Sequence, residues 1–167
     1  MCNQTFHMDL VKLSSQYIDN SFIMEQISCI TMYFATMRTW ITFPEVLTLV
    51  KNLMSYTYSI CDDRSRPIVD SELHHRIYPI FSIFQNMAQF RSSLLPDSPA
   101  AKGLQLLKQI HCVSAMQTYW LRCEDDKDIA GECCRVLLRF VMDGTRPAEG
   151  ITRQELAVVL DRLGLLD

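Results

Sequence analysis

One repeated spacing limits the fold of this chain more than any other feature. Between residues 21 and 37, large apolar side chains recur every three to four residues, at Ile23, Ile27, Ile30, Phe34 and Met37. This spacing matches the turn of an α-helix and lacks the strict alternation of a half-buried strand. The segment is therefore predicted to be a helix with one side packed against the hydrophobic core.

Similar stripes predict six further helices and no strand. Their expected ranges are about 5–18, 42–58, 71–94, 99–121, 129–143 and 152–163. Asn20 or Ser21 can cap the second helix, and Pro79 should kink or split the fourth near Tyr78. We therefore expect an all-α fold of about seven helices in antiparallel pairs. Two architectures fit: a stack of helix pairs that resembles HEAT-type solenoids in general outline, or a globular bundle.

Two helices carry the start signal known as a capping box. Thr42 and Glu45 have this spacing, and so do Thr152 and Glu155. In such a box the hydroxyl accepts from a free backbone N–H of the first turn while the carboxylate reaches back to the cap residue. We therefore expect the third helix to begin at Thr42 and the last at Thr152.

The length predicts one helical domain over residues 1–167. The most polar stretch of the first half lies within residues 59–71 and includes Asp62, Asp63 and Pro67. A polar stretch that interrupts the helical pattern is typical of a loop. If the domain has a sub-boundary, we expect it in the loop 59–71.

Charge and composition exclude several classes of protein. Sixteen basic side chains stand against nineteen acidic ones, a formal net charge of −3 at pH 7. Phosphate neutralisation carries nucleic-acid affinity, so we do not expect a nucleic-acid partner. No apolar run of about eighteen residues occurs, and we expect no membrane association. The start of the chain lacks the pattern of a signal peptide, and the seven cysteines are irregularly spaced. These features predict reduced thiols and an intracellular protein of the cytoplasm or nucleus.

The sequence contains no catalytic or cofactor-binding signature. Phosphate loops, nucleophile elbows and paired zinc ligands are all missing, and the possible metal ligands are widely spaced or directly adjacent: His74, His75, His111, Cys112, Cys123, Cys133 and Cys134. Adjacent residues of a helix point about 100° apart, so they cannot easily share one metal ion. We therefore expect no metal, no cofactor and no enzymatic activity.

Surplus aromatic residues suggest a protein-binding role. Trp40 and Phe43 flank a predicted helix start, and Tyr56 and Tyr58 lie near a predicted helix end, where full burial is harder. Aromatic side chains are enriched at protein interfaces. We therefore expect a non-enzymatic interaction module, a scaffold or adaptor subunit of a larger intracellular complex. Its partner is another protein or a second copy of itself.

Two other functions remain open. A Cys–His pair between helices could form a small enzyme or ligand-binding domain. A nucleic-acid-associated protein could use Arg122, Arg135 and Arg139 as a small basic face.

Overall fold

A computed structural model describes most of the first half of the chain and single positions beyond it. The described residues are 4–37, 40–65, 67–89, 106, 115–116, 118–119, 122, 126, 142–143, 146–147, 154, 157 and 161. They form helices α1 (Gln4–Gln16), α2 (Ser21–Phe34), α3 (Val46–Asp62), α4 (Asp70–Glu72) and α5 (Tyr78–Gln89), with the 3-10 turn η1 (Trp40–Thr42) and the π-helical segment η2 (Leu73–Ile77). The all-α prediction is confirmed for these residues, apart from one short hairpin. In the hairpin, β1 (Met142–Asp143) pairs antiparallel with β2 (Arg146–Pro147).

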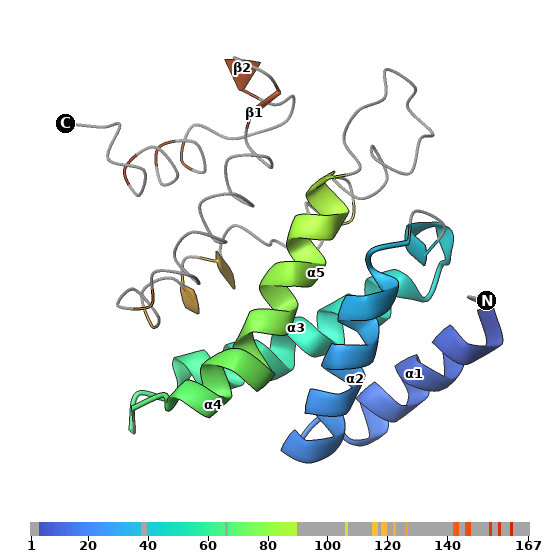
Figure 1. Cartoon of the computed structure of the whole chain (residues 1–167), viewed down its shortest axis with the longest axis horizontal. Helices are drawn as coiled ribbons and strands as arrows, with labels where there is room; N and C mark the ends of the chain where they lie inside the picture. The colour runs from blue at the N-terminus through green and yellow to red at the C-terminus, as the bar shows by residue number, and fades with distance from the viewer. Residues whose placement is uncertain are drawn as a thin grey trace.

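Helix α2 lies at the centre of the described helices. It contacts α1, α3, η2 and α5, while α1 also packs against α3 (Figure 1). The start of α2 is set by Asn20, whose side chain accepts a hydrogen bond from the Ile23 backbone N–H at 3.2 Å. This bond satisfies one of the N–H groups that a helix start leaves unpaired. The predicted cap is therefore confirmed at Asn20.

The buried stripe of α2 differs from the predicted one. Met24, Ile27, Ser28 and Thr31 are buried, whereas Ile30 is exposed. The helix is therefore turned by roughly a quarter turn from the orientation that its largest apolar side chains indicate. The small Ser28 and Thr31 side chains fit between closely packed neighbours, which larger ones would not. Close packing of α2 against its neighbours is thus more favourable than an orientation that would bury all of its large apolar side chains.

The third helix does not begin with the predicted capping box. Helix α3 begins at Val46 with Glu45 as its N-cap residue, and the Glu45 side chain makes no capping bond. The preceding turn η1 buries Trp40 and Ile41 completely, and anchoring both side chains keeps the chain in a tighter turn until residue 46. Thr152, in the second predicted box, lies outside the described residues.

The proline of the fourth predicted helix has the expected effect. Segment η2 directly precedes Pro79, and the Tyr78 N–H donates to the Leu73 carbonyl five residues back. Proline supplies no N–H and its ring clashes with the carbonyl of the preceding turn. A wider π turn accommodates both problems, so the α-helical winding is interrupted over Leu73–Ile77 and resumes at Tyr78 without a gap in the helix.

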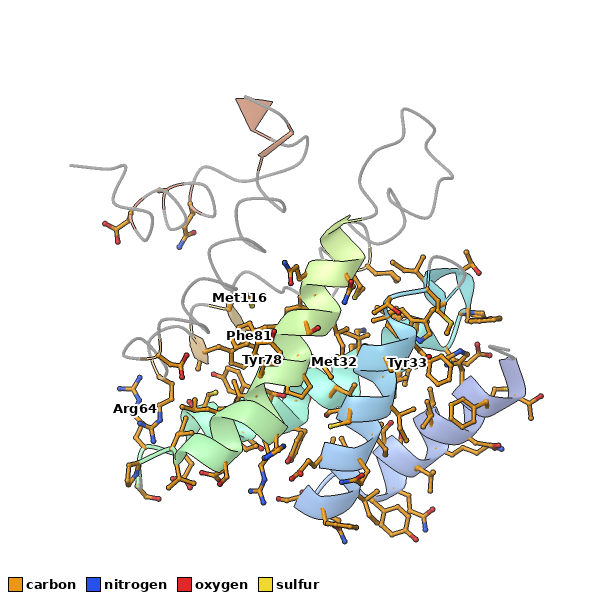
Figure 2. All side chains as sticks on the ribbon, viewed as in Figure 1. Met32, Tyr33, Arg64, Tyr78, Phe81 and Met116 are labelled. Carbon is orange, nitrogen blue, oxygen red and sulfur yellow. The ribbon has the colours of Figure 1, made fainter. Side chains whose placement is uncertain are left out.

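One hydrophobic core extends across the loop before α4. It joins α1, α2, α3 and α5 to Leu106, Ala115, Met116 and Tyr119. The Tyr119 hydroxyl donates to the Met54 carbonyl at 3.0 Å, and its ring meets the Phe81 ring edge-on at 5.5 Å. Figure 2 shows Met116 close to Phe81. The connection between α3 and α4 is shorter than the predicted loop 59–71, because α3 continues to Asp62 and α4 begins at Asp70. Residues on both sides of this connection share one core, while the sub-boundary itself stays a prediction.

The cap at Asn20 gives a first test of this fold. Asn20→Ala removes the side-chain acceptor and should lower the free energy of unfolding by about 1 kcal/mol. Asn20→Asp keeps an acceptor and should retain most of the stability. Urea denaturation of both variants measures the difference, and equal losses would contradict the cap.

The burial of Trp40 gives a second test. Trp40→Ala leaves a large cavity and should lower the free energy of unfolding by about 3–5 kcal/mol. Phe22→Ala, at an exposed aromatic of α2, is the control and should change stability by about 0.5 kcal/mol or less. Chemical denaturation compares the two. A parent-like Trp40→Ala variant would show that this side chain lies outside the core.

Candidate functional site

The outward side of α2 carries the two most exposed large apolar side chains of the described residues. Phe22 is 72% exposed and Tyr33 is 66% exposed, with Ile30 at 38%. Residues 22 and 33 lie almost in line because eleven residues make about three whole turns, and residue 30 lies about 80° round the helix from residue 22. Gln26 and Cys29 lie between them on the same side. We call Phe22, Gln26, Cys29, Ile30 and Tyr33 the α2 face.

The position of the α2 face follows from the packing of its helix. The buried residues Met24, Ile27 and Thr31 lie on the opposite side of α2. Neighbouring helices contact α2, and its side chains outside the α2 face are buried or partly buried, so the α2 face is its most exposed side. In Figure 2, Met32 and Tyr33 leave α2 toward different sides, which marks the boundary between flank and face. The face is therefore a consequence of three-sided packing.

One end of the α2 face rests on a cluster of rings. The Tyr33 ring centroid lies 5.9 Å from that of Phe34, which lies 5.3 Å from Phe6 and 5.6 Å from His7. The His7 ring in turn lies 4.8 Å from Phe43. We call these five residues the aromatic cluster. It connects the exposed Tyr33 ring to the core at the start of α1.

His7 is the titratable group at the centre of the aromatic cluster. Its side chain is fully buried. Burial lowers the pKa of His7 below its ordinary value, while the nearby Glu45 carboxylate opposes this shift. Desolvation disfavours the charged imidazolium more than the single carboxylate favours it. The folded state therefore prefers neutral His7.

The edge of the α2 face next to α5 is held by an ion-pair network. Arg76 Nε lies 3.5 Å from Glu25 Oε2, and its Nη1 lies 3.1 Å from Glu72 Oε1. This arrangement ties α2 to η2 and neutralises the one carboxylate on α2. Burial, followed by the Glu25 charge, raises the pKa of the Cys29 thiol. Cys29 is therefore a protonated, weakly nucleophilic thiol at neutral pH.

The four residues predicted to bind a partner do not form one surface. Trp40 is fully buried and Tyr56 is 4% exposed, so neither ring is available to a partner. The expected exposure of Trp40 is wrong because η1 turns the ring into the core. Phe43 is half-buried in the aromatic cluster, and Tyr58 is 41% exposed on α3. Partner binding through Phe43 and Tyr58 stays a prediction.

The surroundings of Tyr56 indicate a structural role, not a binding one. Its hydroxyl lies 3.4 Å from the Ser21 carbonyl oxygen, to which it donates, and so links α3 to the start of α2. Burial raises the pKa of Tyr56 to about 12, and the Arg76 charge partly offsets this effect. A phenol with so high a pKa stays neutral and serves as a hydrogen-bond donor.

Of the three arginines predicted to form a basic face, the structure describes Arg122. Arg122 Nη2 donates to the Asp63 carbonyl at 3.2 Å, which fixes its guanidinium at the end of α3. Arg135 and Arg139 lie outside the described residues. A joint basic face therefore stays a prediction.

Potential metal ligands do not cluster among the described residues. Within them, no three His, Cys, Asp or Glu side chains are placed to hold one metal ion. Cys29 and Cys61 are free of disulfide bonds. The cysteines at 112, 123, 133 and 134, together with His111, lie outside this part of the chain.

Sequence reasoning missed Phe22 and Tyr33 as surface residues. Both lie within the second predicted helix but outside its expected stripe. A stripe drawn through the small residues Ser28 and Thr31 as well as Met24 and Ile27 would place Phe22 and Tyr33 outward. The signal was therefore present, but the larger side chains suggested a different orientation.

In the part of the chain that is described, no helix is both long and apolar enough to span a membrane. No family model, curated protein or solved structure matches this chain. Its function is therefore inferred from the side chains themselves.

The lowered pKa of His7 predicts a loss of stability in acid. Below about pH 6.5 the unfolded chain binds a proton at His7 more readily than the folded chain, so folding becomes less favourable as the pH falls. Above that pH both states hold neutral His7, and the effect vanishes. The free energy of unfolding should fall more steeply from pH 7 to 5.5 in the parent than in His7→Gln.

The exposed His75 supplies the control for this experiment. His75→Gln should keep the parent's pH dependence, and urea denaturation at each pH measures all three proteins. Identical slopes for the parent and His7→Gln would contradict a buried, neutral His7.

Proposed function

We propose that this chain is a non-enzymatic protein-binding module and that its binding surface is the α2 face. The observation that carries the proposal is the exposure of Phe22 and Tyr33 on one side of a helix whose other sides are packed. Two large aromatic side chains at 72% and 66% exposure leave apolar surface in water. Covering such surface is favourable in proportion to its area.

Chemistry and position both support a protein partner. Aromatic side chains contribute much of the energy of protein interfaces, and an apolar patch bounded by polar groups is typical of such sites. The ion pairs of Arg76 bound the α2 face on one edge. The Phe34 ring lies edge-on to the Tyr33 ring, with the centroids 5.9 Å apart, and restricts the Tyr33 ring on one side. A preorganised ring loses less conformational freedom in a complex.

We further propose that the module is a scaffold or adaptor subunit of a larger intracellular assembly. Antiparallel helix pairs, stacked as in HEAT-type solenoids or closed into a bundle, present such outward helix faces to neighbours. A partner with an apolar surface of its own fits the α2 face, because no formal charge lies on Phe22, Gln26, Cys29, Ile30 or Tyr33.

The other two functions receive less support from the described residues. A thiol nucleophile needs a lowered pKa, whereas burial raises the pKa of Cys29. His7 lies among aromatic rings, and its nearest charged influence is Glu45. The Arg122 guanidinium donates to a backbone carbonyl of its own chain. A basic nucleic-acid surface would need cations directed to solvent.

Site-specific photocrosslinking in cells tests the proposal. A benzophenone side chain placed at Tyr33 should crosslink the full chain to a protein partner. The same group at Tyr58, which is 41% exposed on α3, is the matched control and should give little product. Phe22→Ser should reduce the Tyr33 crosslink by about tenfold or more, because it removes a large apolar contact from the same face.

The two positions separate the possible outcomes. Crosslinking mainly from Tyr58 would overturn the α2 face in favour of the surface predicted from the sequence. A lack of protein crosslinks at both positions would overturn the proposed protein-binding function.

A further inference from the structure

We propose that the partner covering the α2 face is a second copy of this chain, packed against it through antiparallel α2 helices related by a two-fold axis. This inference rests on the proposed function and names the partner for the same surface. It follows from three properties of the α2 face: its charge, its internal symmetry and its area.

The charge of the α2 face favours a partner like itself. None of its five side chains is charged, and the nearby Glu25 is paired with Arg76. A face without charge cannot select a basic or an acidic partner, because recognition of either depends on complementary charge. It matches an uncharged apolar face, and the α2 face of a second copy is one.

The order of side chains along the face suits a two-fold axis. Phe22 and Tyr33 are the bulky ends, and the smaller Gln26 and Cys29 lie between them. In an antiparallel pair, Phe22 of each copy would lie opposite Tyr33 of the other. Each end of the contact would then hold one Phe–Tyr pair, and both copies would use the same patch, as a two-fold dimer requires.

The area of the face sets the strength of the dimer. A well-covered aromatic side chain buries about 150 Å² or more, and the dimer would cover four of them. With the residues between, the total approaches about 1,000 Å², near the lower limit for specific interfaces. We therefore expect a weak dimer that dissociates in the micromolar range.

The same geometry places Cys29 close to the two-fold axis. The midpoint between Phe22 and Tyr33 lies about 2 Å along the helix from Cys29, at 1.5 Å per residue. Packed helix axes lie about 8–10 Å apart, so the two Cys29 Cα atoms would be about 6–7 Å apart. A disulfide spans such Cα distances up to about 6.8 Å. The thiol is half-exposed on this face and free of a disulfide, so it can report on the contact.

Sedimentation and oxidative crosslinking of the purified full chain test the inference. We expect a reversible monomer–dimer equilibrium in the micromolar range under reducing conditions. Diamide, which takes up the two electrons and two protons released by the thiols, should then give a covalent dimer whose peptide map contains a Cys29–Cys29 link. Tyr33→Ser retains Cys29 and should raise the dimer dissociation constant at least about tenfold, whereas Tyr58→Ser should leave it unchanged.

The outcomes separate this inference from the proposed function. A chain that stays monomeric up to about 1 mM, far above the expected micromolar range, would overturn the second copy. If Tyr33 still crosslinks to a different protein in cells, the protein-binding function stands without self-association. A dimer linked through another cysteine and insensitive to Tyr33→Ser would also overturn the inference, because it would place the contact on a different face.

Discussion

The close packing of α2 on three sides is the constraint on which the rest of the described structure depends. Helices α1, α3 and α5 surround it, and buried Ser28 and Thr31 keep its inner side narrow. The Thr31 hydroxyl has no hydrogen-bond partner among the described residues, a cost that burial of a polar group ordinarily carries. The approach of the neighbouring helices offsets this cost. The close packing also leaves one side of α2 facing solvent, and the side chains there are uncharged and mostly apolar.

The two edges of α2 are held by different kinds of interaction. On the α5 side, Arg76 bridges Glu25 and Glu72 and joins α2 to the π-helical segment before Pro79. Arg76 and Glu25 are partly exposed, so their ion pair positions the helices more than it stabilises the fold, whereas the Glu72 carboxylate is buried. On the α1 side, Phe34 stacks among Phe6 and His7. Of these rings His7 is buried, Phe34 is partly buried and Phe6 is 39% exposed, and tilted or edge-on ring contacts add stability beyond the area that they cover.

Local signals in the sequence predicted the elements better than their orientations. The cap at Asn20 and the disturbance of the helix at Pro79 depend on a few neighbouring residues. The cap is confirmed, and the disturbance takes the form of a π-helical segment. The start of α3 and the outward side of α2 depend on distant contacts, and both predictions were wrong. Trp40 illustrates the reason: a helix end exposes a ring only if no other segment covers it, and η1 places this ring in the shared core.

The candidate surface was harder to predict than the helices for the same physical reason. Hydrophobic periodicity shows that one side of a helix is more apolar than the other, but tertiary contacts determine which side is buried. Here Phe22 and Tyr33 are larger than Ser28 and Thr31, yet the smaller residues are the buried ones. A large apolar side chain left outward on a packed helix costs solvation free energy in the isolated chain. Such a residue is therefore better evidence for a contact with another molecule than an aromatic residue at a helix end.

The aromatic cluster connects the α2 face to the buried side chain of His7. Tyr33 lies against Phe34, Phe34 against His7, and His7 against Phe43, so a series of rings runs from solvent to a buried imidazole. Neutral His7 fits these apolar surroundings, because burial disfavours the imidazolium more than the nearby Glu45 carboxylate favours it. The ring packing at the start of α1 is therefore matched to neutral His7, and this packing lies against one end of the α2 face.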